Sequence, residues 1–168
     1  MSSTAEDIKS DEEMFEEGSP KGELEEVRVT PVSFHAACIA KAEVILNKPL
    51  VKITRTSYQT PDNLVSLTCA VSKVYPRDNK ELYWFAFHPH YKEFLVNSNK
   101  GYVLFGCGSV DNLIFIPISQ FVTWLNDLWV TEKGGRTYWH VHIAKEGNRF
   151  FLLRSKGSSP VDITQYLI

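Results

Sequence analysis

One stretch decides the expected fold: residues 64–90 read LVSLTCAVSKVYPRDNKELYWFAFHPH. Between Leu64 and Tyr75, apolar side chains recur at every second position apart from Lys73, which predicts a strand with one apolar face that ends in a lysine. Residues 76–80 are polar and include proline, aspartate and asparagine, so they predict a turn. The aromatic-rich segment from Glu81 to His88 predicts a second strand that returns beside the first. The sequence therefore predicts a hairpin at the centre of a sheet.

The remaining sequence predicts two helices and further strands around this hairpin. One helix is expected from the capping residue Ser33 to about Leu46, and another after Pro117, where apolar residues follow at helical spacing. Shorter strands are expected at residues 50–55, 102–106, 113–116, 137–143 and 149–153, of which the last two form a C-terminal hairpin. The predicted fold class is α+β (mixed α/β), with a mostly antiparallel sheet and two packed helices.

The composition predicts one domain behind an acidic leader. A chain of 168 residues, 43% of them hydrophobic, builds one sizeable core. Residues 1–26 carry ten acids and two bases, whereas the rest carries ten acids and sixteen bases. We therefore expect an acidic disordered tail at residues 1–27 and a single globular domain at residues 28–168. The basic domain suits an anionic partner, for which the protein's own acidic tail is a candidate competitor.

The cysteines and the N-terminus indicate where the protein resides. Cys38, Cys69 and Cys107 are odd in number and widely spaced, which argues against a disulfide framework and a structural zinc site and favours free thiols in a reducing compartment. The N-terminus has no basic segment followed by an apolar one, and no run approaches the ~20 apolar residues of a membrane span. We therefore expect a cytoplasmic protein with no membrane partner.

Two short motifs suggest phosphodiester chemistry. Pro61-Asp62 precedes the strand that ends in Val71-Ser72-Lys73, and a metal-dependent phosphodiesterase needs a carboxylate for the cation and a lysine for the developing charge. The order of helix, strand, Pro-Asp, strand ending in lysine and further strand resembles the PD-(D/E)XK (restriction-endonuclease-like) superfamily over residues 34–126. Residues 102–121 also resemble a passage of some of these nucleases in their order of strand, turn, strand, Ile-Pro and helix.

The resemblance implies catalytic roles and one departure from them. By carry-over, Asp62 binds Mg²⁺ or Mn²⁺ and Lys73 is the catalytic lysine. The acidic position two residues before the lysine is Val71, so Glu81, Glu43 or Asp111 would have to supply the missing carboxylate. A degenerate, non-cleaving member that still binds DNA is the alternative. The plain alternative for both residues is structural, with Asp62 serving a turn and Lys73 extending from a strand end.

The histidines form a second constellation. Four of the five occur as His88-Pro-His90 and His140-Val-His142, and a one-residue spacing on a strand points both rings to one face. If the two strands are neighbours, a four-imidazole cluster holds Zn²⁺ or another transition metal, as in a metal-binding protein or hydrolase. The alternative is that these rings make hydrogen bonds at the surface of a sheet.

Aromatic and basic residues provide the third signal. Exposed aromatic rings beside Lys and Arg stack unpaired bases while the charges follow the phosphates. We expect most aromatic residues to be core, with one or two exposed. The candidate nucleic-acid-binding residues are Lys92, Lys100, Arg136, Arg149 and Arg154.

Three functions follow from these patterns. The first is a nucleic-acid-associated protein of PD-(D/E)XK-like type, active or non-cleaving. The second is a metal-binding protein or hydrolase that uses the two histidine pairs. The third is a non-catalytic protein-interaction module. Convergent polar groups in a cleft favour the first two, and a large exposed apolar patch favours the third.

Overall fold

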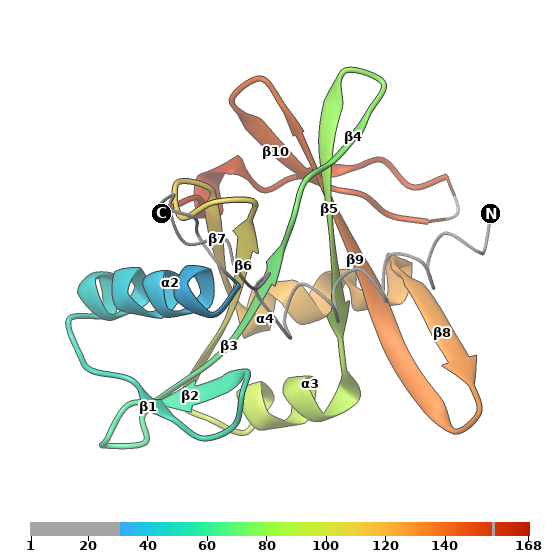
Figure 1. Ribbon diagram of the computed structural model, residues 1–168. Coiled ribbons are helices and arrows are strands. Elements are labelled where there is room, and N and C mark those ends of the chain that lie inside the picture. The colour runs from blue at the N-terminus through green and yellow to red at the C-terminus, as the bar shows by residue number, and fades with distance from the viewer. Residues whose placement is uncertain (1–30, 156) are drawn as a thin grey trace, which may run out of the picture.

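The computed structural model describes residues 31–155 and 157–168 (Figure 1). These residues form three α-helices, which are α2 (Pro31–Leu46), α3 (Pro89–Val96) and α4 (Ile118–Phe121). They also form two 3₁₀ segments, η1 (Val122–Asp127) and η2 (Thr164–Tyr166). Within this part of the chain, we find no helix that could span a membrane. The acidic tail predicted at residues 1–27 lies outside the described residues.

The first sheet has the strand order β1-β2-β3-β6-β7. Its strands are β1 (Val51–Lys52), β2 (Ser57–Gln59), β3 (Val65–Ser72), β6 (Lys100–Cys107) and β7 (Leu113–Pro117). β3 and β6 are parallel, whereas the other neighbours are antiparallel. Parallel neighbours require a crossover connection, and here the chain passes through the second sheet and α3 before it enters β6.

The second sheet has the strand order β11-β10-β9-β5-β4, and β8 pairs with residues 136–140, the N-terminal part of β9. Its strands are β4 (Tyr75–Arg77), β5 (Lys80–Phe87), β8 (Trp129–Lys133), β9 (Arg136–Glu146), β10 (Arg149–Leu152) and β11 (Val161–Asp162). Its pairs are antiparallel. The prediction of a mostly antiparallel α+β fold is therefore confirmed, although the described strands divide between two sheets.

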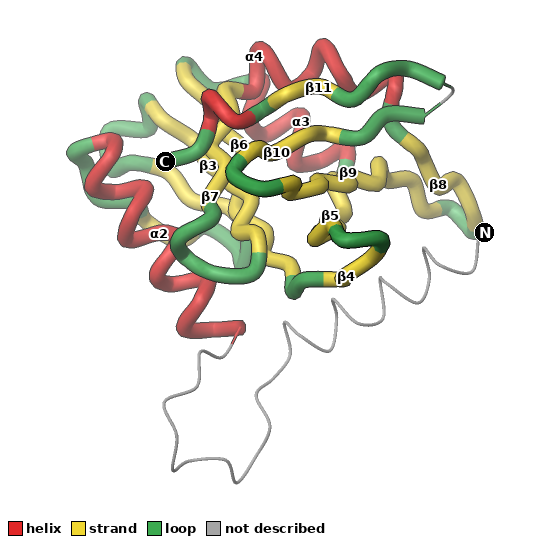
Figure 2. The backbone as a smooth tube through the Cα atoms, turned by 90° about the horizontal axis from the view of Figure 1, so that it is seen from above, coloured by secondary structure: helices red, strands yellow, loops and turns green. Residues whose placement is uncertain are grey.

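Figure 2 shows the backbone of the packed layers, which two hydrophobic cores hold together. α2 covers one face of the first sheet, where Phe34 and Cys38 belong to the same buried cluster as Leu67. The other face of the first sheet packs on the second sheet, and the rings of Phe85 and Phe105 lie 4.6 Å apart between centroids. The order of layers is α2, first sheet, second sheet. The outer face of the second sheet therefore remains on the side away from α2.

The predicted central hairpin is wrong in its pairing. β3 and β5 belong to different sheets, because the chain crosses from one sheet to the other after Ser72. The short strand β4 pairs with β5 instead, and the two-residue turn between them has positive φ at Asp78 and Asn79. This is the backbone that a tight hairpin needs, and Asp and Asn tolerate it well. The Ser72 hydroxyl accepts a hydrogen bond of 3.1 Å from the Trp84 amide, which ties the sheets at the crossing.

The predicted helices also differ in part. The first is found as α2, whereas the second is a short α4 that continues as the 3₁₀ segment η1. The additional helix α3 begins at Pro89, within the His88-Pro-His90 motif that the sequence analysis placed on a strand. Proline suits the first position of a helix, where its missing N–H costs no hydrogen bond. Gly101 lets the end of α3 approach β6, because a Cβ there would lie 2.5 Å from the Leu95 carbonyl oxygen.

Candidate functional site

Asp62 stabilises the turn between β2 and β3. Its carboxylate accepts hydrogen bonds from the Thr60 hydroxyl at 2.6 Å and the Leu64 amide at 3.0 Å, and forms an ion pair with Lys48 at 3.0 Å. The Thr60 hydrogen bond, followed by those of Leu64 and Lys48, lowers the pKa of Asp62 to about 2. The side chain is exposed. These contacts describe a carboxylate that orders a turn.

Lys73 lies at the opposite end of β3 from Asp62. Asp62 precedes the strand and Lys73 follows it, so all eight residues of β3 separate them. A strand of that length spans about 26 Å. The Lys73 amine instead lies over the ring of Tyr75, 5.3 Å from its centroid. The expected convergence of Asp62 and Lys73 is therefore not found.

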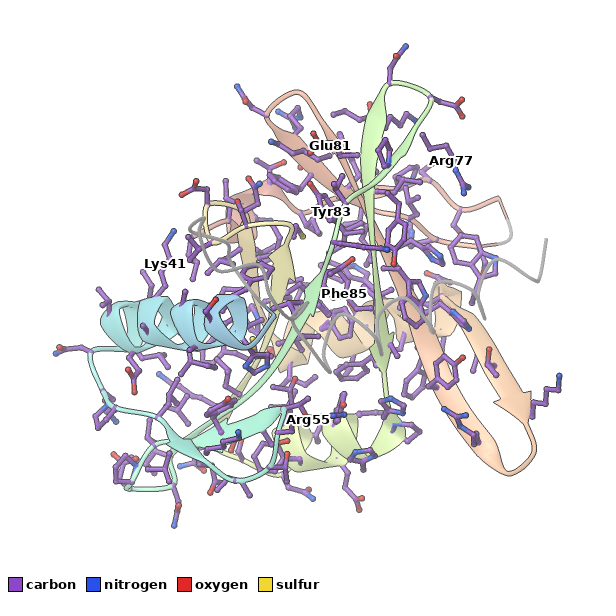
Figure 3. The ribbon with its side chains drawn as sticks, in the orientation of Figure 1. Lys41, Arg55, Arg77, Glu81, Tyr83 and Phe85 are labelled. Atoms are coloured by element: carbon purple, nitrogen blue, oxygen red, sulfur yellow. The ribbon has the colours of Figure 1, made fainter. Side chains whose placement is uncertain are left out.

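The carboxylates that were expected to complete the site make other contacts. Glu81 accepts a hydrogen bond of 2.8 Å from the Tyr83 hydroxyl (Figure 3). Burial, together with this hydrogen bond, raises the pKa of Tyr83 above its ordinary value. Glu43 accepts a hydrogen bond of 2.7 Å from the Leu50 amide. Asp111 lies in the turn between β6 and β7. These residues do not form the carboxylate group that a Mg²⁺ or Mn²⁺ site would need among the described residues.

The outer face of the second sheet gathers the histidines. Directly paired residues of an antiparallel sheet share a face, so the register places Trp84 of β5 on the same side as His140 and His142 of β9. His88, which follows β5, joins this side through its ring contact with Tyr138. β8 adds Trp129, which is opposite His140. We call this surface the histidine face. Its further members along β4, β8 and β9 are Tyr75, Arg77, Thr131, Lys133, Arg136 and Tyr138.

His140 has a defined tautomer because both of its ring nitrogens have partners. The Trp84 indole N–H donates to Nδ1 at 3.1 Å, so in the neutral ring the proton is on Nε2. Nε2 lies 2.6 Å from the Thr131 hydroxyl, to which it donates. Burial lowers the pKa of His140. A proton on Nδ1 would also point at the Trp84 indole N–H, and two donors cannot bond to each other, so this ring is held neutral.

His142 is the more unusual of the two. Its ring stacks parallel to His140 at 6.2 Å and contacts the Trp129 ring edge-on at 5.1 Å. Its Nδ1 atom is buried, and the described residues provide no hydrogen-bond partner for it. Burial, followed by the charges of His140 and Arg77, lowers the pKa of His142 to about 4. The ring is therefore neutral at physiological pH.

The other histidine pair lines a pocket at the start of α3. His88 and His90 lie 5.5 Å apart between ring centroids. They border an open pocket of roughly 480 Å³ together with Arg136 and Tyr138, which come from the β8–β9 hairpin. The Arg136 guanidinium lies 5.9 Å from the centroid of the Tyr138 ring. The positive end of the α3 dipole and the Arg136 guanidinium favour anions here, whereas Glu93, which also lines the pocket, opposes them.

The four histidines do not form the expected metal cluster. Tyr138 lies between the pairs, since its ring contacts His88 at 5.5 Å and His140 at 4.9 Å. Both nitrogens of His140 are already hydrogen-bonded to protein groups. Within residues 31–155 and 157–168, no three His, Cys, Asp or Glu side chains are placed to hold a metal ion. The arrangement therefore does not fit Zn²⁺, and the alternative of hydrogen-bonded rings on a sheet describes His140 better.

The predicted nucleic-acid-binding residues are spread over several surfaces. Arg136 lies on the histidine face, and Lys92 of α3 lies 5.9 Å from the Trp139 ring. Arg149 forms an ion pair with Asp162, and Arg154 forms one with Asp127 at 3.2 Å. Lys100 begins β6 in the other sheet.

Two basic residues that the sequence interpretation missed lie on the histidine face. They are Arg77 and Lys133, both exposed (Figure 3 shows Arg77 on the side of β4 and β5 away from α2). Alternation along residues 129–133 would have indicated Lys133, whereas Arg77 required the pairing of β4. Followed along the described strands to β10 and β11, the same face carries five bases and two acids, a net charge of +3. The bases are Arg77, Lys80, Lys133, Arg136 and Arg149, and the acids are Glu146 and Asp162. Glu146 forms an ion pair with Lys80, and Asp162 forms one with Arg149. The other three bases of this face are Arg77, Lys133 and Arg136.

The histidine face also carries the exposed aromatic ring. Trp129 is 43% exposed, and it is the one aromatic residue of the described chain in the exposed class. The prediction that most aromatic residues are core, with one or two exposed, is therefore confirmed.

In comparisons with known proteins, no family model, curated protein or solved structure matches the chain. The resemblance to PD-(D/E)XK proteins stays a prediction.

Proposed function

We propose that the protein binds single-stranded nucleic acid through the histidine face and does not cleave it. The observation that carries this proposal is that an exposed indole and a cluster of basic side chains share one face of a sheet. Trp129 offers a ring for stacking, while Lys133 and Arg136 lie on the same β8–β9 hairpin. Base stacking on an aromatic ring is insensitive to sequence, and nearby cations follow the phosphates.

The charges support a binding role of moderate strength. Arg77, Lys133 and Arg136 are exposed, and they lie around rings that are neutral because they are buried. Three phosphate contacts on a single strand give a slope of about −2 in a plot of log affinity against log salt. Affinity should therefore fall by about 20-fold between 50 and 200 mM salt.

The absence of cleavage follows from the positions of the expected catalytic residues. Asp62 and Lys73 lie at opposite ends of β3, and Asp62 is engaged in its turn. A phosphodiesterase needs its carboxylate and its lysine at one scissile phosphate. The free, buried cysteines suit the cytoplasm as the place where the protein meets its ligand.

The proposal is tested by fluorescence anisotropy with labelled single-stranded and duplex DNA. We expect tighter binding of the single strand by the full chain and loss of most salt dependence in the double variant Lys133→Gln/Arg136→Gln. With one phosphate contact left, the affinity of the double variant should fall only about threefold between 50 and 200 mM salt. The matched control is Lys41→Gln/Lys100→Gln, which removes the same charge from α2 and β6 and should bind as the parent does.

Three results would contradict the proposal. The first is no salt-sensitive binding of either DNA, and the second is equal loss in the two double variants. The third is cleavage of DNA in the presence of magnesium or manganese, which would restore the nuclease hypothesis. Deletion of residues 1–26 tests the acidic tail as a competitor, since affinity should then rise if those residues occupy the basic face.

A further inference from the structure

A second cavity lies on the other side of the molecule, between α2 and the edge of the first sheet. It has a volume of roughly 500 Å³ and is mostly apolar. We call it the α2 pocket. The side chains that form its apolar wall are Ala36, Ile39, Ala40, Tyr58 and Val71. Cavities of about 300–1,000 Å³ hold drug-sized ligands, so this space suits one small organic molecule.

The polar groups in the wall satisfy each other. His35 lies 3.2 Å from the Cys69 carbonyl oxygen through Nε2, and a carbonyl only accepts, so Nε2 carries the proton. Nδ1 then accepts from the Tyr58 hydroxyl at 3.4 Å. Burial is the main cause that lowers the pKa of His35. The wall therefore presents the neutral, mutually hydrogen-bonded rings of His35 and Tyr58. A ligand does not have to supply hydrogen bonds to them.

The mouth of the pocket is basic. Lys52 of β1 and Arg55 of the following loop line it, and both are exposed. After burial, their charges contribute to the lowered pKa of His35. Glu43 also lines the pocket, but its carboxylate accepts the Leu50 amide at 2.7 Å and so joins the end of α2 to the chain before β1. Figure 3 shows Arg55 beside the end of β2.

We propose that the α2 pocket binds a small aromatic anion, with its ring between α2 and Tyr58 and its carboxylate or sulfonate at Lys52 and Arg55. An apolar wall selects the ring and a basic mouth selects the charge, which together match an amphipathic anion. This site is separate from the histidine face, since the α2 pocket lies on the α2 side of the first sheet and the histidine face lies on the outer side of the second sheet. If the α2 pocket binds no such anion, the nucleic-acid proposal is unaffected.

The test uses the fluorescence of anilinonaphthalene sulfonate on the full chain. Ala40→Trp places an indole in the pocket from an exposed position on α2, and Val44→Trp is its control because Val44 is 77% exposed on the same helix and does not line the pocket. We expect binding to fall by at least about tenfold with the first variant and to stay unchanged with the second. Thermal unfolding establishes that both variants are folded.

The role of charge is tested with an uncharged probe of the same shape. Lys52→Gln/Arg55→Gln should weaken anilinonaphthalene sulfonate by about fivefold to tenfold and leave the neutral N-phenyl-naphthylamine within about twofold. Naphthoate should displace the sulfonate probe. Equal binding by Ala40→Trp and Val44→Trp overturns the proposal, as does equal loss of both probes. Binding that appears only after deletion of residues 1–26, or only in a dissociated dimer, overturns it too, because the occupant is then the leader or a second copy.

Discussion

Replacing His142 with phenylalanine should remove a large part of the acid sensitivity of this protein. The folded chain lowers the pKa of His142 to about 4, mainly through burial, whereas an unfolded histidine has a pKa of about 6.5. Between these values the unfolded chain binds a proton that the folded chain does not. The contribution of neutral His142 to the free energy of unfolding is therefore fully present above pH 6.5 and is lost as the pH falls towards 4.

The size of the effect follows from the two pKa values. Their difference corresponds to about 3.4 kcal/mol at most, and about 2.5 kcal/mol of it should be lost between pH 7.5 and 4.5. The phenylalanine variant cannot take up this proton. At pH 7.5 its stability should lie within about 1 kcal/mol of the parent, because Nδ1 of His142 has no partner among the described residues and the ring retains its contact with Trp129.

Urea unfolding followed by tryptophan fluorescence measures this difference at several pH values. The parent should lose about 2.5 kcal/mol more than His142→Phe on going from pH 7.5 to 4.5. His90→Phe is the control, since His90 is exposed, and it should follow the parent. Parallel curves for the parent and His142→Phe would refute the reasoning. They would mean that His142 takes up its proton in the folded protein as easily as in the unfolded chain.

Two further substitutions test the packing and the binding face. Gly101→Ala should lower the free energy of unfolding by about 2 to 3 kcal/mol, since the new Cβ would lie 2.5 Å from the Leu95 carbonyl oxygen. Gly147→Ala, at a positive φ with open space around it, should cost only about 1 kcal/mol, and equal losses in urea unfolding would contradict this account. Trp129→Ala should weaken single-stranded DNA binding by about tenfold through lost stacking. Val130→Ala, on the opposite face of β8, should leave the anisotropy titration unchanged, and a similar loss would argue against stacking.

The sequence was most informative where local periodicity decides the structure. Alternation over residues 137–143 correctly placed His140 and His142 on one face of a strand, and their stacked rings confirm it. The same alternation extends to Arg136. Side-chain direction along a strand depends on the strand alone, so it can be read without knowing the neighbours.

Pairing between distant segments could not be predicted in the same way. β3 has the alternation expected of it, but its parallel partner β6 begins 28 residues after β3 ends, and no local pattern indicates that choice. The expected site fails whichever strand is the partner of β3, because Asp62 precedes this strand and Lys73 follows it. With β3 between them, the two residues cannot meet.

The charge of the histidine face has a definite distribution that links its structure to the proposed function. At neutral pH its two central imidazoles, His140 and His142, are neutral because they are buried, so the positive charge comes from the guanidinium and ammonium groups of Arg77, Lys133 and Arg136. A strand of nucleic acid has the complementary arrangement, with uncharged bases beside a line of phosphates. The exposed ring of Trp129 lies next to the neutral centre, where a base would stack, and the basic side chains lie where phosphates would pass. A metal enzyme would require the reverse, with ligands free at the centre, and here Trp84 and Thr131 occupy both nitrogens of His140.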